Sequence, residues 1–231
     1  MMIRSFAAVG LAGSLLFGVT RAELLPMYQV ARSFALPVEW TRKVDVEATA
    51  ADVRVLTGAP GLIECEFILA DTLLPPTIAL VEEEGESEVK VLQPAAARHS
   101  DDEVWTVRVD PEIVACFVMT DTGDVDIGLS SGSEVTLFAA TDSGHVTIDL
   151  SEMASGTIEG MLLTNSGNLL LYVPADAEIR FGVQDDRELE VPGFVRDGED
   201  WHHLPEGDVD LTVSLWSDVK SGAVRVVLTG E

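Results

Sequence analysis

Three segments in the middle of this chain of 231 residues repeat one pattern without a gap. Each has three apolar residues, then Thr, Asp or Asn, Ser or Thr, and Gly, and then a stretch in which every second residue is apolar. The shared glycines are 21 and 23 residues apart, and weaker Ser-Gly steps fall between them. Tandem self-similarity of this kind is typical of repeat architectures. The shared glycines are Gly123, Gly144 and Gly167, and the intermediate ones are Gly132 and Gly156.

The half of each unit that follows the glycine predicts a β-strand with one buried face. In the middle copy Val146, Ile148 and Leu150 occupy every second position, so they share one face, while Thr147 faces solvent. The sequence before this strand predicts a turn in which Gly accepts positive φ. One unit cannot bury its apolar face alone, but stacked copies can. The repeat therefore predicts an all-β fold, a β-solenoid like a single-stranded β-helix with repeats of about 21–23 residues.

Degenerate copies extend the pattern towards both ends of the chain. Residues 48–55 fit the register with Ala51 in the place of the glycine, and residues 219–226 fit it with Gly222. The longest departure from the repeat is the segment 184–207. Further strands are expected at 62–69, 88–92, 104–109, 177–183 and 209–215.

The first 22 residues are predicted to be a signal peptide, 1–22. A short positive start with Arg4 precedes an apolar stretch of about 16 residues, and the segment ends at the small residue Ala22. This stretch is shorter than the roughly 20 residues that span a bilayer, but an uncleaved anchor and a mitochondrial transit peptide remain as alternatives. Cleavage leaves a lead segment over 23–41 and one solenoid domain over 42–231, without direct membrane insertion of the mature chain. The expected location is secreted, periplasmic or on the cell surface.

The chain carries 40 acidic and 14 basic residues, which gives a formal net charge of −26. A charge of this sign is repelled by nucleic-acid phosphates and anionic lipid, so we expect no nucleic-acid partner. On exposed strands the acids keep the surface soluble and discourage pairing between sheet edges of different molecules.

Two cysteines, Cys65 and Cys116, lie outside the leader. Export permits the one intramolecular disulfide that two cysteines can form, and alternation places Cys65 on an apolar face. Two buried free thiols are the equal alternative. The sequence has no Cys-x-x-Cys pair, so a redox motif is not expected.

Several segments together resemble a known bacterial family. They are the entry VDVEATAADVRVL at 44–56, the repeat unit TDSGHVTI at 141–148 and the join LLLYVPADAEI at 169–179. They are similar to the putative-adhesin domain of toast-rack type, a domain of unknown function formed by exported β-solenoids. The acid that usually follows the glycine in this family is replaced here by His145 and Asn168. The resemblance implies a β-solenoid with no catalytic or cofactor-binding residues to carry over.

Aspartates gather in the repeat turns, where a calcium site is one interpretation. Asp121, Asp124 and Asp126 lie in one turn, and Asp142 and Asp149 lie in the next. Calcium-binding β-rolls use nine-residue glycine-rich repeats, whereas the period here exceeds twenty. These turns are therefore interpreted as solvated, and we expect no metal and no cofactor.

The segment 184–207 holds the candidate ligand-contact residues Trp201, His202 and His203. Long insertions in solenoids often carry function. Adjacent histidines on a strand point to opposite faces, so binding one metal together would require a loop. We interpret the segment as an exposed polar loop capped by a packed Trp.

The sequence thus favours a non-enzymatic exported module for adhesion, binding or structure, with a protein or a glycan as its partner. One alternative is a sensory or regulatory domain in envelope-stress signalling. Another is a glycan-active enzyme, which would require acids that converge in a groove.

Overall fold

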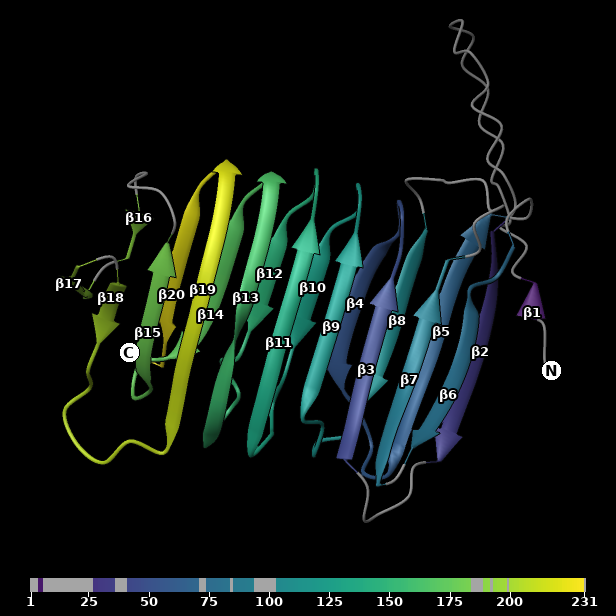
Figure 1. Ribbon diagram of the computed structural model, residues 1–231, viewed down its shortest axis with the longest axis horizontal. Coiled ribbons are helices and arrows are strands. Elements are labelled where there is room, and N and C mark those ends of the chain that lie inside the picture. The colour runs from purple at the N-terminus through teal and green to yellow at the C-terminus, as the bar shows by residue number, and fades with distance from the viewer. Residues whose placement is uncertain are drawn as a thin grey trace, which may run out of the picture.

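The computed structural model shows an all-β protein, as the sequence predicts. The regular elements of its described residues are all β-strands, which form two sheets, A and B, of ten strands each. Figure 1 shows these strands side by side in a long slab, with sheet B towards the viewer and sheet A behind it. The predicted signal peptide lies, apart from Arg4–Ser5, outside the described residues. Those are residues 4–5, 27–35, 41–70, 74–83, 85–93, 103–183, 189–191, 193–198 and 200–230.

The strands of each sheet follow an order that differs from their order in the chain. Sheet A contains, in spatial order, β1 (Arg4–Ser5), β2 (Met27–Ala35), β5 (Leu62–Ala70), β8 (Val104–Val109), β4 (Asp52–Thr57), β10 (Val125–Gly128), β12 (Val146–Asp149), β14 (Leu169–Pro174), β20 (Val224–Thr229) and β16 (Leu189–Glu190). Sheet B contains β17 (Val195–Asp197), β18 (Asp200–His203), β15 (Glu178–Val183), β19 (Leu211–Ser221), β13 (Gly156–Ser166), β11 (Glu134–Thr141), β9 (Ala115–Thr120), β3 (Thr41–Glu47), β7 (Glu86–Leu92) and β6 (Thr77–Glu83).

Consecutive strands of the repeat region alternate between the two sheets. Strands β9, β11 and β13 lie in sheet B, β10, β12 and β14 lie in sheet A, and neighbours within each sheet are parallel. Ile148 pairs with Ile127 on one side and with Leu171 on the other. In sheet B, Phe138 is likewise flanked by its counterparts in the other copies. The gapless alignment of the three copies therefore predicts which residues are neighbours.

The core lies between the sheets and consists of the alternating apolar positions. Val146 and Ile148 are fully buried, and the apolar residues beside them in β10 and β14 are buried as well. Thr147, between them, is only half-buried. Burying an aliphatic side chain of this size stabilises a fold by about 1.5–3 kcal/mol. Stability therefore comes from stacking the copies, because each strand needs neighbours to cover its apolar face.

The turn glycines form a ladder in which successive copies touch. A Cβ on Gly144 would lie 2.0 Å from the carbonyl oxygen of Gly123, and one on Gly167 would lie 1.7 Å from that of Gly144. A Cβ on Gly222 would lie 1.9 Å from the oxygen of Gly167. Positive φ, the reason expected from the sequence, occurs at Gly222 but not at the other three glycines. Glycine is required at those three because the neighbouring backbone leaves no room for a side chain.

The opposite edge of the slab has a second pair of stacked glycines. A Cβ on Gly156 would lie 2.3 Å from the carbonyl oxygen of Gly132. Both residues also have positive φ, 127° at Gly156 and 155° at Gly132. At this edge backbone conformation and close approach both require glycine.

Threonine side chains stabilise the glycine ladder from within. The hydroxyl of Thr141 donates to the carbonyl of Gly123 at 2.9 Å, and that of Thr164 donates to Gly144 at 3.0 Å. Both threonines are buried. The Thr of the repeat pattern therefore satisfies a carbonyl that the next copy covers.

The residue that follows each glycine also links one copy to the next. The backbone N–H of His145 donates to Asp124 Oδ1 at 2.8 Å, and that of Asn168 donates to His145 Nδ1 at 2.9 Å. The N–H of Ala223 donates to Asn168 Oδ1 at 2.9 Å. Asp, His and Asn each supply an acceptor, so the replacement of the usual acid preserves the ladder. These side chains lie at the surface, as expected, but they also join the copies.

The two ends of the slab depart from the simple order of copies. Strands β19 and β20 lie between the β13–β14 copy and the β15–β16 copy, and β3 and β4 lie between β9–β10 and β7–β8. Antiparallel strands extend both ends, with β2, β5 and β6 at one and β18 and β17 at the other. The segment 184–207, expected to be a loop, contains β16, β17 and β18.

Both cysteines are buried free thiols, and they lie in different sheets. Cys65 is on β5 of sheet A, and Cys116 is on β9 of sheet B. Burial raises the pKa of each thiol to about 12, because a low-dielectric surrounding disfavours the thiolate. Neither thiol is therefore reactive at neutral pH.

Candidate functional site

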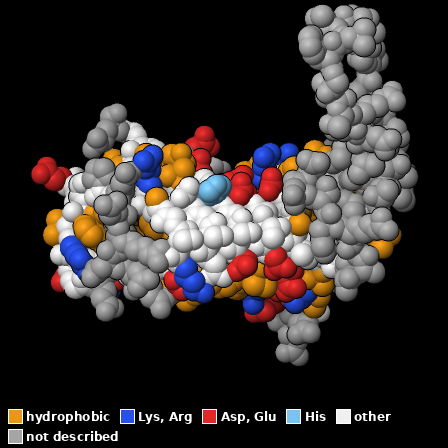
Figure 2. Space-filling view, turned by 90° about the horizontal axis from the view of Figure 1, so that it is seen from above, with side chains coloured by type: hydrophobic (Ala, Val, Ile, Leu, Met, Phe, Trp, Pro, Cys, Tyr) orange, Lys and Arg blue, Asp and Glu red, His pale blue; other side chains and the backbone are white. Residues whose placement is uncertain are grey.

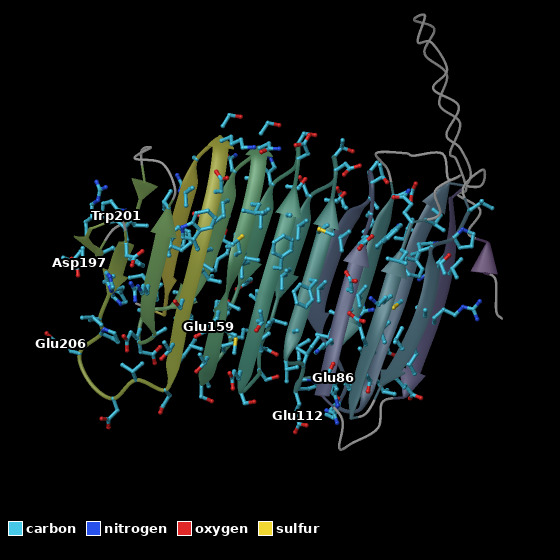
Figure 3. All side chains as sticks on the ribbon, viewed as in Figure 1. Glu86, Glu112, Glu159, Asp197, Trp201 and Glu206 are labelled. Atoms are coloured by element: carbon cyan, nitrogen blue, oxygen red, sulfur yellow. The ribbon has the colours of Figure 1, made fainter. Side chains whose placement is uncertain are left out.

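The candidate ligand-contact residues lie on a strand and not in the predicted loop. Trp201, His202 and His203 make up most of β18, which pairs antiparallel with β15 and β17 at the edge of sheet B. Figure 3 labels Trp201 at this end of the slab. Strand alternation sends His202 to one face and its two neighbours to the other. The two histidines are therefore not placed to share a metal ion.

Trp201 and His203 pack inwards and hold this edge in place. Trp201 pairs with Phe181 and His203 pairs with Ile179, and both partners are fully buried. The Nε2 atom of His203 lies 2.9 Å from the carbonyl oxygen of Ala175. Because a carbonyl can only accept, the ring N–H is the donor. His203 thus ties β18 to the turn between β14 and β15.

Charged side chains also brace this edge of sheet B. The guanidinium of Arg196 lies over the ring of Trp201, 5.8 Å from its centre. Arg180 Nε donates to the carboxylate of Asp200 at 2.8 Å. An exposed cation–π contact contributes about 0.5–1 kcal/mol. Together these contacts hold β18 in place, and the segment that starts at Leu204 follows directly after this strand.

A hollow of about 740 Å³ opens where the chain leaves β18. One wall is the segment that starts at Leu204, whose side chain is 69% exposed, and another is the turn between β14 and β15. Glu206, labelled in Figure 3, lies in this segment. The C-terminal hollow thus combines apolar side chains with two carboxylates in an open surface. Its lining residues are Ser151, Pro174, Ala175, Asp176, His203, Leu204, Pro205, Glu206, Thr229 and Gly230.

Of the three residues selected from the sequence, only His203 borders this hollow. Sequence reasoning missed Leu204 and Pro205, although an apolar pair directly after the strand was visible in the chain. It also missed Asp176, which lies in a distant turn that the fold brings close. Trp201 and His202 have structural positions on the neighbouring strand.

The aspartates of the repeat turns accept hydrogen bonds from protein groups, as Asp124 does in the ladder described above. Asp142 accepts a hydrogen bond from Asn165 Nδ2, and Asp149 accepts from Ser151 Oγ at 2.6 Å. Within the described part of the chain, no group of three or more His, Cys, Asp or Glu side chains is placed to hold a metal ion. Figure 2 looks onto the edge formed by the upper turns, where uncharged groups dominate and acidic side chains lie beside them.

Two partly buried aspartates on the outer faces of the sheets have raised pKa values. Burial is the main cause of the raised pKa at Asp45, and the negative charge of Glu47 adds to it. Burial also dominates the raised pKa of Asp126, where the nearby Arg54 guanidinium opposes it. A carboxyl with a raised pKa binds its proton more tightly in the folded than in the unfolded state. Its ionised form therefore lowers stability at neutral pH, and this loss is relieved as the pH falls through the raised pKa.

We expect Asp45→Asn to be more stable than the wild type at about pH 7, since the buried charge is gone. The advantage should shrink as the pH falls through the raised pKa of Asp45, because the wild-type carboxyl then takes up its proton. Urea unfolding of both proteins across this range measures the difference. An advantage that grows on acidification would contradict the raised pKa of Asp45.

Comparisons with known proteins bear on the fold. Neither a protein-family model nor a curated protein sequence matches the chain. The structure is similar to a putative cell adhesion protein from Clostridium sporogenes, at 15% identity and a TM-score of 0.70, over 86% of this chain and 98% of that one. It is also similar to a putative adhesin from Bacteroides fragilis, at 9% identity and a TM-score of 0.33, over 86% and 97% of the two chains.

The likeness to the Clostridium sporogenes protein shows a shared fold and no more, because the sequence identity is low. At the level of fold it confirms the resemblance to the putative-adhesin family found in the repeat. The described residues contain no helix that is long and apolar enough to cross a membrane.

Proposed function

We propose that this protein is an exported, non-enzymatic binding module with a β-solenoid fold, which acts in adhesion at the cell surface or in the periplasm. The leader at 1–22 supports export. The alternation of strands between two sheets in parallel register supports the solenoid. The fold likeness to a putative cell adhesion protein agrees with a role in adhesion.

The C-terminal hollow is the observation that carries the proposal. The chain leaves its repeat after β16 and returns to it at β19, and in between it adds an exposed apolar wall to a frame of buried strands. Concave, partly apolar surfaces on rigid frames are typical of binding sites. We propose that a protein or glycan ligand contacts this wall at Leu204 and Pro205.

The groups around the hollow favour binding over catalysis. His203 is held by its contact with Ala175, and its Nδ1 faces the carbonyl of Gly193 at 3.5 Å. Both ring nitrogens therefore face backbone carbonyls, which leaves the ring poorly placed to act as a general base. The hydroxyl of Ser151 is bonded to Asp149 instead of a histidine.

Binding can be tested with the purified full chain on an array of defined glycans and extracellular proteins. We expect retention of at least one array member, and Leu204→Asp should weaken it by about tenfold or more by placing charge in the apolar wall. The matched control is Val195→Asp, a residue 70% exposed on β17 and outside the hollow, which should bind like the wild type. Equal binding by Leu204→Asp and wild type would refute the hollow as the contact surface.

A further inference from the structure

The outer face of sheet B carries a continuous apolar surface across four strands. Parallel register places Phe117, Phe138, Met161 and Trp216 in one row over β9, β11, β13 and β19. Equivalent residues of neighbouring strands lie about 4.8 Å apart, so their side chains form an unbroken row. The adjacent row adds Met119 and Leu163. These six residues are called the sheet B strip below.

The side chains of the sheet B strip are accessible. Met161 is 40% exposed, Met119 39% and Trp216 37%. Their strands face the viewer in Figure 1, and Figure 3 shows side chains standing out from this face. Single exposed apolar residues are common, but a contiguous apolar patch marks an interaction surface.

The outer face of sheet A, on the opposite side of the same copies, carries polar and charged side chains. On the outer face of sheet A, one row consists of Arg54, Asp126, Thr147, Leu170 and Arg225. Its first two members form an ion pair at 3.6 Å. The repeat thus tolerates polar residues at outward positions. The apolar character of the sheet B strip is therefore not a requirement of the fold.

A hollow of about 370 Å³ lies at the lower end of the strip, beside Phe117. It forms because the small residue Ala115 stands in register between Lys43 and Thr136. Glu134 closes its lower side. The hollow gives a partner side chain a place to enter the otherwise level face of the sheet.

Carboxylates border the strip at both ends of its strands. Glu159 is two residues before Met161 on the same face of β13, and Asp218 is two residues after Trp216 on β19. The ion pairs of the described residues include none of Glu159, Asp218 and Glu134.

Three basic residues of this face are neutralised by ion pairs, whereas Lys220, two residues after Asp218 on β19, adds a positive charge at the upper end of the strip. Lys43 pairs with Glu86 at 2.7 Å, and Arg180 pairs with Asp200. Lys90 contacts both Asp45 and Glu88. The carboxylates Glu134, Glu159 and Asp218, which take part in none of these ion pairs, outnumber the single cation of Lys220. The border of the strip is therefore negative, and a bound segment with positive ends would complement it.

We propose that the sheet B strip binds a segment of a partner protein in which a short apolar run is flanked by Lys or Arg. The apolar run would cover Phe138 and Met161, with one side chain in the hollow beside Phe117. The flanking cations would meet Glu159 and Asp218. A second copy of this chain is a poor occupant, because its strip would bring the same carboxylates face to face in a protein of net charge −26. This surface lies apart from the C-terminal hollow, so the two proposals can fail independently.

The probe is a blocked synthetic peptide, KKFLFLKK, titrated into the full chain while Trp fluorescence and heat are recorded. We expect saturable binding with a change in Trp emission, since Trp216 lies on the strip. The matched peptide EEFLFLEE should bind about tenfold more weakly or worse, because its ends repel the border. Added salt should weaken the binding of the basic peptide.

Met161→Glu should weaken the binding of KKFLFLKK by about tenfold, because it places a charge in the middle of the apolar row. The matched control is Leu170→Glu on the outer face of sheet A, which should bind like the wild type. Glu159→Gln keeps the apolar row intact and should weaken only the basic peptide, which provides a second test if Met161→Glu does not fold. Urea midpoints establish that each variant is folded.

Equal binding of the two peptides, or no binding of either, would overturn the proposal. So would an equal loss of binding in Met161→Glu and Leu170→Glu. Light scattering that shows a dimer of the wild type, lost in Met161→Glu, would identify a second copy as the occupant and also overturn it.

Discussion

Replacing Ile148 by Asp is expected to remove several kcal/mol of stability, out of a total of about 5–15 kcal/mol for a domain of this kind. Ile148 is fully buried between Ile127 and Leu171, so the new carboxylate would have neither water nor a cation beside it. Its neighbour Thr147 points to the outer face of sheet A. Thr147→Asp should therefore lose only about 1 kcal/mol, largely from like charge next to Asp126.

Urea unfolding of the two variants measures this contrast directly. Ile148→Val and Thr147→Asn serve as controls, because they change volume or hydrogen bonding without adding charge. Ile148→Val should cost about 0.5–1.5 kcal/mol. Equal midpoints for Ile148→Asp and Thr147→Asp would mean that adjacent residues do not face opposite sides, and the strand assignment would be wrong.

The repeat pattern was sufficient to predict the centre of the fold. Alternation identified the buried face, and the gapless alignment of copies identified the neighbours of Val146 and Ile148 in the parallel sheet. Both predictions succeed because adjacent copies are consecutive in the chain. The register then follows from keeping each apolar face buried.

The order of strands at the two ends could not be predicted in this way. Strands β19 and β20 lie beside β13 and β14, although the segment that contains β15 to β18 separates them in the chain. Each degenerate copy can stack on any free sheet edge. The local pattern therefore does not specify which copy is its neighbour.

The two surfaces proposed for binding were predicted only in part. The segment at 184–207 was rightly singled out as a departure from the repeat, but its polar composition suggested a loop where β18 forms an edge strand. The sequence did contain an indication of the sheet B strip. Phe117, Val118 and Met119 are consecutive apolar residues, and strict alternation forces two of them to face outwards. Such a run in a two-sheet repeat indicates an apolar outer surface.

The hydrogen bonds that join the copies at the turns could not be predicted from the sequence either. From the sequence, Asp124 and His145 have the pattern of solvated polar residues. In the structure each accepts a hydrogen bond from a backbone N–H of another copy. A donor in another copy is not visible in a local sequence window. The glycines were recognised, but their close contact with the preceding copy could not be inferred from spacing.

Gly144→Ala is expected to cause the second large loss of stability, because Gly144 lies in close contact with the backbone of the preceding copy. The added Cβ would lie 2.0 Å from the Gly123 carbonyl oxygen and 2.9 Å from the Thr141 hydroxyl, and real Cβ atoms do not approach backbone so closely. The two copies would have to separate, and the hydrogen bond from Thr141 to Gly123 would be lost. We expect a loss of more than about 3 kcal/mol, or failure to fold.

Gly128→Ala is the matched control, because the same substitution there meets only the end of a flexible side chain. Its Cβ would lie 3.1 Å from Leu56 Cδ2, and the backbone at Gly128 does not have positive φ. We expect a change within about 1 kcal/mol, since Ala also lowers the entropy of the unfolded chain. Both midpoints come from urea unfolding monitored by circular dichroism. If Gly144→Ala were as stable as Gly128→Ala, the copies could not be in contact through the glycine ladder, and the missing Cβ would not explain why glycine recurs with the repeat.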